Sequence, residues 1–329
     1  MSDTKKTRIP IWRDERAYAV LAQVAFVVVV IAAGVFLFGN LLSALRRQNI
    51  PIGFDFLPTR AGFDISDSFL EYTASSNYLQ AFQVGLVNTL VVASVGIVLA
   101  SVFGLITGLA GLTHNFIISR LARVYTEIMR NVPLLVFLVF WYRGIVFNLP
   151  KISEALSIGP ILVSNRGVAI PWLLDGALSL PVVRGRIFDG GFVLSPELFA
   201  ILSGLVIYTA AFIGEVIRAG VQAIPRGQFE AARALGFTGM QSIRLIVLPQ
   251  ALRVIIPPLT SQYLNLTKNS SLAAAVGYPD LWSISTVIIN QTGRAVEMIA
   301  VVMGIYLTTS LLTSLFMNWY NNKVRLIER

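Results

Sequence analysis

The chain contains no cysteine and a single histidine, His114. The absence of cysteine excludes disulfides, thiolate nucleophiles and cysteine-ligated metals. One histidine excludes a multi-histidine metal site and a paired-histidine proton relay, and we interpret His114 as a surface residue. Charged residues are also scarce, at 13% of the chain, whereas ordinary globular proteins carry about a quarter. The scarcity of charged residues indicates a membrane protein. We expect no metal site, and no catalytic site either, because the motifs Gly-x-Ser-x-Gly and His-Glu-x-x-His are absent.

Apolar residues, by contrast, are abundant and come in long blocks. They make up 55% of the 329 residues, and the mean hydropathy is +0.72. A run of about 20 apolar residues is long enough to cross a bilayer as a helix. Six runs reach or approach that length: residues 17–38, 81–112, 133–149, 198–217, 255–277 and 298–319. The expected fold is all-α, a polytopic transmembrane helical bundle of about six spans and up to eight.

The segments between these runs predict the organisation of the chain. Residues 1–80 combine a polar, basic tail, an extra helix too long for a cleaved signal peptide, and an external loop. Residues 81–329 form the main transmembrane domain, with an external insertion at about 150–196 that is rich in Pro and Gly. We expect part of the insertion to be re-entrant or a short helix pair. Gly104 and Gly108 have a small-xxx-small spacing, which we attribute to generic helix packing rather than a specific dimer motif.

The distribution of charge predicts the orientation in the membrane. With a cytoplasmic amino terminus and alternating spans, the inner segments hold 15 basic and 7 acidic residues, a net charge of +8. The outer segments hold 9 basic and 10 acidic residues, a net charge of −1. Basic residues favour the cytoplasmic side, so both termini are expected inside. The net charge of +9 then reflects topology and not nucleic-acid binding, which needs a clustered basic face with interleaved aromatics.

The most specific pattern lies in the cytoplasmic segment 218–249. Residues 228–235 are a run of good helix formers, and Gly236 stands where a helix C-terminal glycine belongs. A second short helix over residues 240–248 is expected to lead through Pro249 back to the membrane. The segment is therefore predicted to form a compact helix–turn–helix on the inner surface.

The first of these two helices offers a surface for a soluble partner. Ala231, Ala232 and Ala234 are expected to leave a flat face that a partner can approach closely. Glu230 and Arg233 add charged anchors. A short rigid helix of this kind can dock into a groove of a partner. A solvated interfacial helix is the alternative that these residues alone leave open.

The spacing in this segment resembles the EAA loop of ABC-importer permeases. Seven residues over twenty positions match it: Glu230, Ala231, Ala232, Gly236, Ile246, Leu248 and Pro249. Short flanking motifs resemble the polar amino-acid (His/Glu/Gln/Arg) branch of that family: residues 208–211, 214–215, 248–253, 268–272 and 127–133. Asn131-Val132 departs from the commoner Gly-Thr, and Asn269 stands where Asp is frequent. The extra first helix and the insertion look most similar to the general L-amino acid permeases.

The resemblance implies an ABC importer type I permease fold and a subunit that carries L-amino acids, polar or acidic ones and their amides, by alternating access. It implies three protein partners in a bacterial inner membrane: a periplasmic amino-acid-binding protein, a second and different permease chain, and a cytoplasmic ATPase dimer that receives the EAA helix. The chain lacks a G-x-x-x-x-G-K-[ST] phosphate loop, so ATP and Mg²⁺ are expected on the ATPases and no cofactor here. Two alternatives remain: a permease for another small polar solute, and a secondary transporter or channel without an ATPase.

Polar residues inside the predicted spans are candidates for the substrate path, because charge within a membrane is costly. The strongest group lies in the fifth span: Asn265, Lys268, Asn269, Ser270 and Ser271. Lys268 is expected either to face an anionic group of the substrate or to snorkel to the outer interface. The preceding pair of prolines, Pro257-Pro258, is expected to loosen the helix and free backbone carbonyls.

Two secondary candidates lie in other spans. Asn88 is in the second span, and Glu215 is near the inner end of the fourth. Glu215 is also spaced i, i+3 from Arg218, which favours an ion pair on one helix. Arg130 stands before Pro133 and is expected either to cap the cytoplasmic gate or to belong to the excess of basic residues on the cytoplasmic side, which is the interpretation that we favour.

Overall fold

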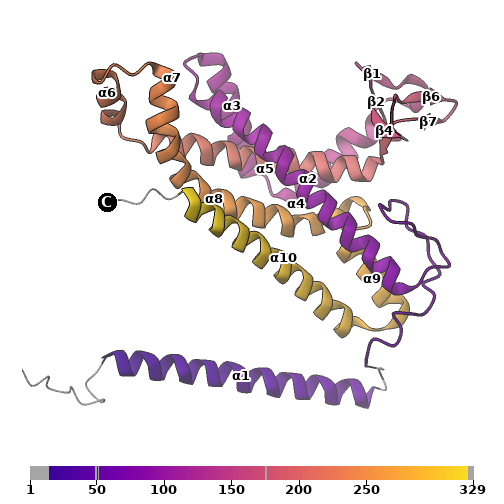
Figure 1. Cartoon of the computed structure of the whole chain (residues 1–329). Helices are drawn as coiled ribbons and strands as arrows, with labels where there is room; N and C mark the ends of the chain where they lie inside the picture. Colours follow the sequence, from indigo (N-terminus) through magenta and orange to yellow (C-terminus); the bar gives the residue numbers. More distant parts are fainter. Residues whose placement is uncertain (1–14, 49, 51, 175, 325–329) are drawn as a thin grey trace, which may run out of the picture. The chain divides into compact units, whose positions relative to one another are not determined.

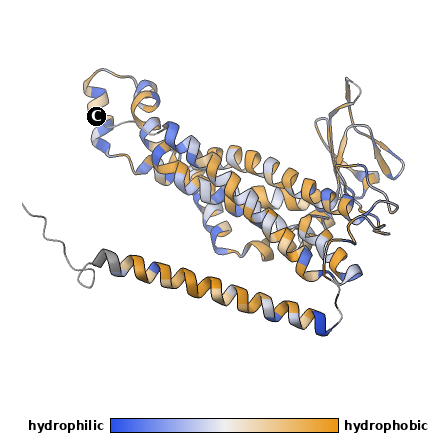
Figure 2. Ribbon diagram, turned by 60° about the horizontal axis from the view of Figure 1, so that its bottom comes forward, coloured by the Kyte–Doolittle hydropathy of each residue, from blue (hydrophilic) through white to orange (hydrophobic). Residues whose placement is uncertain are grey.

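The computed structural model describes residues 15–48, 50, 52–174 and 176–324. The chain divides into two compact units, residues 1–54 and 55–329, which are described separately. The first contains α1 (Glu15–Arg47), which is exposed along nearly all of its described length and long enough to cross a bilayer. Figure 2 shows that hydrophobic residues cover most of it. The basic tail before α1, and Arg325 and Arg329, lie outside the described residues.

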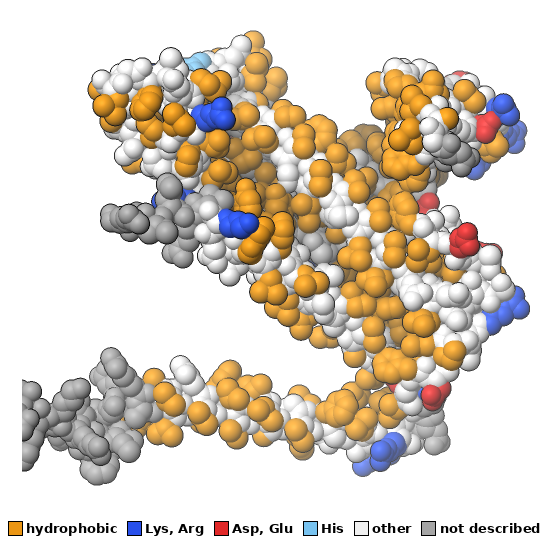
Figure 3. All heavy atoms as spheres, viewed as in Figure 1, with side chains coloured by type: hydrophobic (Ala, Val, Ile, Leu, Met, Phe, Trp, Pro, Cys, Tyr) orange, Lys and Arg blue, Asp and Glu red, His pale blue; other side chains and the backbone are white. Residues whose placement is uncertain are grey.

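The second unit is built mainly from long helices (Figure 1). They are α2 (Tyr78–Leu112), α5 (Pro196–Gln222), α8 (Leu248–Asn269) and α10 (Ala295–Val324). In the described part of the chain, five helices including α1 are long and apolar enough to span a membrane, or six if one bent pair counts as a span. The prediction of a helical bundle with about six spans is confirmed. On the face in Figure 3, hydrophobic side chains predominate over these helices.

The helices α2 and α5 pack closely because α2 carries glycine where they meet. A Cβ atom at Gly104 would lie 2.5 Å from Ile213 Cγ2, and one at Gly108 would lie 2.8 Å from the carbonyl oxygen of Gly214. Both glycines are buried. The small-xxx-small spacing therefore serves packing within the chain, as the simpler interpretation predicts.

The third predicted span, residues 133–149, forms only the second half of a bent pair of helices. The basic connector before it is itself a helix, α3 (Phe116–Asn131), followed by α4 (Leu134–Phe140) and short irregular turns to Asn148. The two halves are bent by 107°. Pro133 explains the break, since proline disfavours a helical conformation in the preceding residue, and Val132 is extended.

The insertion is β-structure, so the expectation of a re-entrant segment or a short helix pair is wrong. Four short strands form an antiparallel sheet in the order β1-β2-β3-β8, and β4–β5 and β6–β7 form two hairpins. The strands are β1 (Leu156–Ile158), β2 (Ile161–Ser164), β3 (Gly167–Ile170), β4 (Trp172–Leu174), β5 (Ala177–Ser179), β6 (Val182–Arg184), β7 (Ile187–Asp189) and β8 (Phe192–Leu194). Glycine residues of the insertion form hairpin turns, as at Gly185 with φ +63°.

The fifth predicted span is longer than expected at its amino-terminal end. A continuous helical run extends over Gly239–Val276, from α7 (Gly239–Ser242) through a π-helical turn into α8. The second helix predicted over 240–248 is therefore the start of this run. Pro257 and Pro258 lie inside α8 without ending it. A helix inside a bundle tolerates such prolines where its surroundings satisfy the freed backbone groups.

One short helix has no counterpart in the predicted spans. It is α9 (Leu281–Thr292), which Asp280 caps at its amino end and Gly293 closes with φ +70°. Leu281, Ile284 and Ile288 of α9 are buried in a cluster with α2 and α10. Phe56, in the loop before α2, joins the same cluster. Residues 55–77 of that loop are therefore part of the second unit.

Candidate functional site

The segment that resembles the EAA loop forms a compact element at one end of α5. The helix α6 (Arg226–Ala234) follows α5 after a short turn, while the β-insertion precedes α5 (Figure 1). Because α5 is 27 residues long, about 40 Å of helix separates the two. The element and the insertion therefore lie at opposite ends of the bundle.

The carboxyl end of α6 is closed by a complete Schellman motif. The Gly236 N–H donates to the carbonyl of Arg233 at 3.0 Å, and the Phe237 N–H donates to the carbonyl of Ala232 at 3.1 Å. Gly236 has φ +78°, which is the left-handed conformation that this motif requires. The sequence prediction of a helix-terminating glycine at this position is confirmed.

One face of α6 is anchored to the transmembrane helices. Ala232 is fully buried, and Phe229 packs against a cluster from the end of α5 and the start of α8. That cluster consists of Ile224, Val247, Ala251 and Ile255. The flat face predicted from three alanines is therefore wrong for Ala232, which points inward because the helical period places it with Phe229.

The other face of α6 is open. Glu230, Ala231, Arg233 and Ala234 are exposed, and Leu235 is 76% exposed. In α7 and the π-helical turn, Met240, Ile243 and Leu245 are exposed too. Exposed apolar groups gathered next to charged ones are typical of a protein interface. This surface can receive a soluble partner.

The remaining residues of the pattern lie where α8 begins. Ile246 and Pro249 are half-buried, and Leu248 is 45% exposed. Gln250 ties this part to α6, since its Nε2 donates to the Ile246 carbonyl at 2.9 Å and to Gln228 Oε1 at 3.4 Å. The structure thus gathers all seven residues of the pattern into one element.

The polar run of the fifth predicted span divides into two sets. Asn265 and Lys268 are exposed and spaced i, i+3 on α8, and Asn269 is half-buried. The two serines bond to their own helix: the Ser270 hydroxyl donates to the Thr267 carbonyl and the Ser271 hydroxyl to the Lys268 carbonyl. Only Asn265 and Lys268 of this run are open on the surface of the chain.

Asn88 has a different environment from that surface. It is fully buried, and its Nδ2 donates at 2.8 Å to the carbonyls of Asp67 and Pro279. It joins α2 to the loop before it and to the segment before α9. The structure does not bring it together with Lys268 on an exposed face.

Glu215 lies in an ion cluster, and the predicted pair with Arg218 is confirmed. The Arg218 guanidinium donates to both carboxylate oxygens of Glu215, at 2.9 and 2.6 Å. Arg130 of α3 adds a third charge, with its Nη1 3.7 Å from Glu215 Oε1. The sequence did not predict this contact between α3 and α5, because the cytoplasmic excess of basic residues already accounted for Arg130.

Two acidic side chains near the amino ends of α5 and α9 are held in unusual environments. Burial raises the pKa of Asp280 to about 7, although the backbone N–H groups of Ser283 and Trp282 donate to it. Burial also raises the pKa of Asp67, against the effect of the hydrogen bond from Ser195. The sequence analysis counted Asp67 and Asp280 only as charges of the external segments, because the sequence of a loop does not show which of its side chains are buried.

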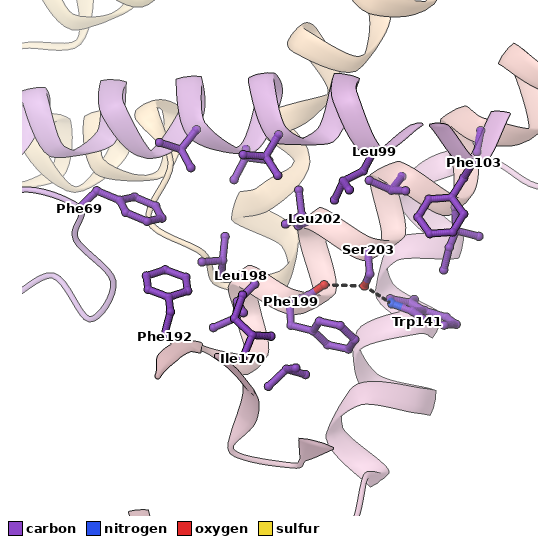
Figure 4. A pocket seen from close by; sticks show the side chains of 18 of the residues that line it. Phe69, Leu99, Phe103, Trp141, Ile170, Phe192, Leu198, Phe199, Leu202 and Ser203 are labelled. Atoms are coloured by element: carbon purple, nitrogen blue, oxygen red, sulfur yellow. Dashed lines mark hydrogen bonds between the residues drawn. The ribbon is translucent and has the colours of Figure 1, made fainter. Parts of the chain in front are cut away.

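A large cavity between α2, α5 and the insertion has a different character (Figure 4). Its volume is about 880 Å³, and none of the described residues that line it is charged. Two of its few polar side chains satisfy each other, since Trp141 Nε1 donates to Ser203 Oγ, which donates to the Phe199 carbonyl. Such a lining suits apolar chains and gives no partners to the charged groups of a polar solute.

Comparisons with known proteins agree on one family. The model of the inner membrane component of binding-protein-dependent transport systems matches residues 100–326. The chain is 41% identical to the putative amino-acid ABC transporter permease protein YhdX of Escherichia coli, over 94% of each chain. It is 36% identical to the general L-amino acid transport system permease protein AapQ of Rhizobium johnstonii, over 96% of this chain and 94% of that protein.

A third relative and one solved structure extend this likeness. The glutamate/glutamine/aspartate/asparagine transport system permease protein BztB of Rhodobacter capsulatus is 32% identical, over 96% of each chain. A crystal structure of an amino acid ABC transporter superposes with a TM-score of 0.56 at 26% identity, covering 75% of this chain and 95% of that chain.

Proposed function

This chain belongs to the family of inner membrane components of binding-protein-dependent transport systems, and we propose that it is the permease subunit of an ATP-driven importer of L-amino acids. It is a multi-pass membrane protein with the expected fold of an ABC importer type I permease. The family sets aside the alternative of a secondary transporter without an ATPase. The observation that carries the proposal is the EAA element, the seven residues of the pattern together with α6, in which α6 has one buried face and one open face.

The proposed mechanism is alternating access driven from the cytoplasm. A loaded binding protein docks on the outside, ATP closes a pair of ATPases, and α6 carries this closure into the bundle. Phe229 and Ala232 support the proposal, since a load on α6 passes through them to α5 and α8. Packed helices transmit such a load by shifting as rigid bodies. Glu230 and Ala231, on the open face, would contact the ATPase.

The partners follow from the family. Its description implies a binding protein, and an ABC permease works with ATPase subunits. We propose that ATP and Mg²⁺ bind only to a cytoplasmic ATPase dimer, since this sequence lacks the phosphate loop. We also propose a second, different permease chain, and both termini on the cytoplasmic side, as the charge distribution favours.

The substrate class rests on the relatives. Two of them are named for general L-amino acid transport and for glutamate, glutamine, aspartate and asparagine transport. We propose that this chain carries polar and acidic L-amino acids and their amides. Asn265 and Lys268 are candidates for contact along the path, because they alone in the polar run are exposed.

ATP-dependent uptake of labelled L-glutamate by the reconstituted complex tests the proposal. Glu230→Lys and Gly236→Asp should abolish uptake while the protein still reaches the membrane, because each places a new charge on the docking surface. Glu230→Gln is the matched control without reversed charge, and it should retain part of the activity. Normal uptake with both charge-changing variants would reject the coupling role.

The orientation can be tested separately, because the chain has no cysteine of its own. A single cysteine introduced as Glu230→Cys should react with an impermeant maleimide only after the cells are opened. Arg186→Cys, in the exposed β-insertion, should react in intact cells. Labelling of Glu230→Cys from outside would overturn the proposed topology.

A further inference from the structure

A polar cavity lies between α3 and the carboxyl-terminal half of α5. Its volume is about 470 Å³, within the range of small-molecule sites. The residues that line it are Arg123, Thr126, Glu127, Arg130, Asn131, Glu215 and Arg218. They include three guanidinium groups and two carboxylates, so the cavity carries a net charge of +1. It differs from the large apolar cavity in offering charged partners of both signs.

Two of these charges satisfy each other. The carboxylate of Glu215 accepts two short hydrogen bonds from Arg218, and such a bidentate pair leaves little capacity for a further ligand. Arg123 is also engaged, since its Nε donates to the carbonyl of Ser119 at 3.2 Å. These groups form the wall of the cavity.

The other two charges are open. The Arg130 side chain is 49% exposed, and its closest acidic partner, Glu215, is 3.7 Å away, which is beyond hydrogen-bond distance. Its donors therefore remain available. Glu127 is exposed one turn before it on α3, and no hydrogen bond to its carboxylate exists among the described residues. An open cation and an open anion thus stand at i, i+3 in one cavity.

We propose that this cavity binds the zwitterionic head group of the transported amino acid on the cytoplasmic half of its path. The Arg130 guanidinium takes the carboxylate, for which its forked donors are suited. Glu127 accepts hydrogen bonds from the ammonium group. The proposal rests on the proposed function, and it assigns substrate contacts to α3, which the substrate-path candidates do not include.

The charges also predict a preference among substrates. Side chains at i, i+3 on a helix have Cβ atoms about 5–6 Å apart, which suits a ligand whose two charged groups are attached to one carbon. A phosphate or a lipid headgroup phosphate needs the cation but is repelled by Glu127. Because the net charge is positive, L-glutamate should bind better than L-lysine.

The test uses the purified permease–ATPase complex in phosphatidylcholine nanodiscs, without the binding protein and without anionic lipid. Binding of tritiated L-glutamate is measured by scintillation proximity. We expect saturable binding that weakens at least tenfold in Arg130→Gln and in Glu127→Gln, and less in Arg130→Lys. Arg120→Gln removes an exposed arginine of the same helix that does not line the cavity, and it should leave the affinity unchanged.

Competition in the wild-type complex gives a readout that needs no variant. L-glutamate should displace the label at least tenfold better than L-lysine, and inorganic phosphate should not displace it. Wild-type affinity in both Arg130→Gln and Glu127→Gln would overturn the proposal, as would equal displacement by phosphate, which indicates a general anion site. If the wild-type complex imports amino acids while these results fail, only this inference falls. Absence of ATP-dependent import in the wild type would instead refute the proposed function.

Discussion

Replacement of Gly236 tests whether the shape of α6 carries the coupling. A Cβ atom at this position meets nothing within 4 Å, so alanine creates no clash and acts only through the backbone. Its φ of +78° is left-handed, which costs an ordinary L-residue about 1–2 kcal/mol. Since about 1.4 kcal/mol corresponds to a tenfold change in an equilibrium constant, the equilibrium constant between the intact and the frayed carboxyl end of α6 should fall roughly 5–30-fold in Gly236→Ala.

The assay is ATP-dependent uptake of labelled L-glutamate in proteoliposomes, with the amount of assembled complex measured in parallel. Gly236→Ala should reduce uptake by up to the same factor while assembly is retained. Gly236→Asn is the matched control, because asparagine enters the left-handed region far more readily, and its uptake should stay within about twofold of wild type. Gly236→Val should be the most impaired, since a β-branched residue tolerates this conformation least.

The series also separates backbone from charge. Asparagine and aspartate have nearly the same shape, so a loss in Gly236→Asp that is absent in Gly236→Asn reports the charge placed on the docking surface. Equal uptake by the glycine, alanine and valine forms would refute the reasoning, because the Schellman motif would then have no part in coupling.

Three further predictions concern stability. Gly108→Ala should destabilise the complex by about 1–3 kcal/mol in thermal unfolding, since its Cβ would press on the Gly214 carbonyl. Gly304→Ala in α10, whose Cβ would meet nothing within 4 Å, should be nearly neutral. Burial raises the pKa of Asp280 to about 7 in the folded chain, from 3.8 when the chain is unfolded, so the unfolding temperature should fall as the pH rises between these two values. Asp280→Asn keeps a helix cap but has no proton to lose. Its unfolding temperature should depend less on pH and should be higher than that of the wild type at pH 8. Asn88→Ala should cost about 1–3 kcal/mol in chemical denaturation, because the carbonyls of Asp67 and Pro279 lose their donor.

The sequence alone identified the EAA element but not its orientation. The run of helix formers and the closing glycine specify α6 locally, so its existence followed from residues 225–237. The three alanines alone do not show which of them points inward. The one available signal was Phe229, because the helical period places Ala232 on the same face as this apolar side chain, and the fold shows that Ala232 is buried.

Pairings between distant segments were out of reach for a related reason. Arg130 and Glu215 lie far apart in the sequence, and each has a sufficient local explanation, in one case the charge distribution and in the other Arg218. The prediction for the insertion was wrong for a different reason. Its strands are three or four residues long, too short for a two-residue period to emerge, so part of the insertion was predicted to be re-entrant or a short helix pair. The long, apolar spans were predictable because their signal extends over many residues.

The positions of Glu127 and Arg130 relative to the EAA element suggest how substrate release is coupled to the movement of α6 in the proposed transport cycle. Glu215 and Arg218 lie on the last two turns of α5 and form one wall of the polar cavity, while the following turn leads into α6. The other wall, with Glu127 and Arg130, belongs to α3, which the bend at Pro133 separates from α4. A movement of α6 that displaces the end of α5 relative to α3 therefore changes the distance between the two walls. A substrate held by α3 would be released by the same motion that the ATPases impose on α6, with no separate gate needed at that position.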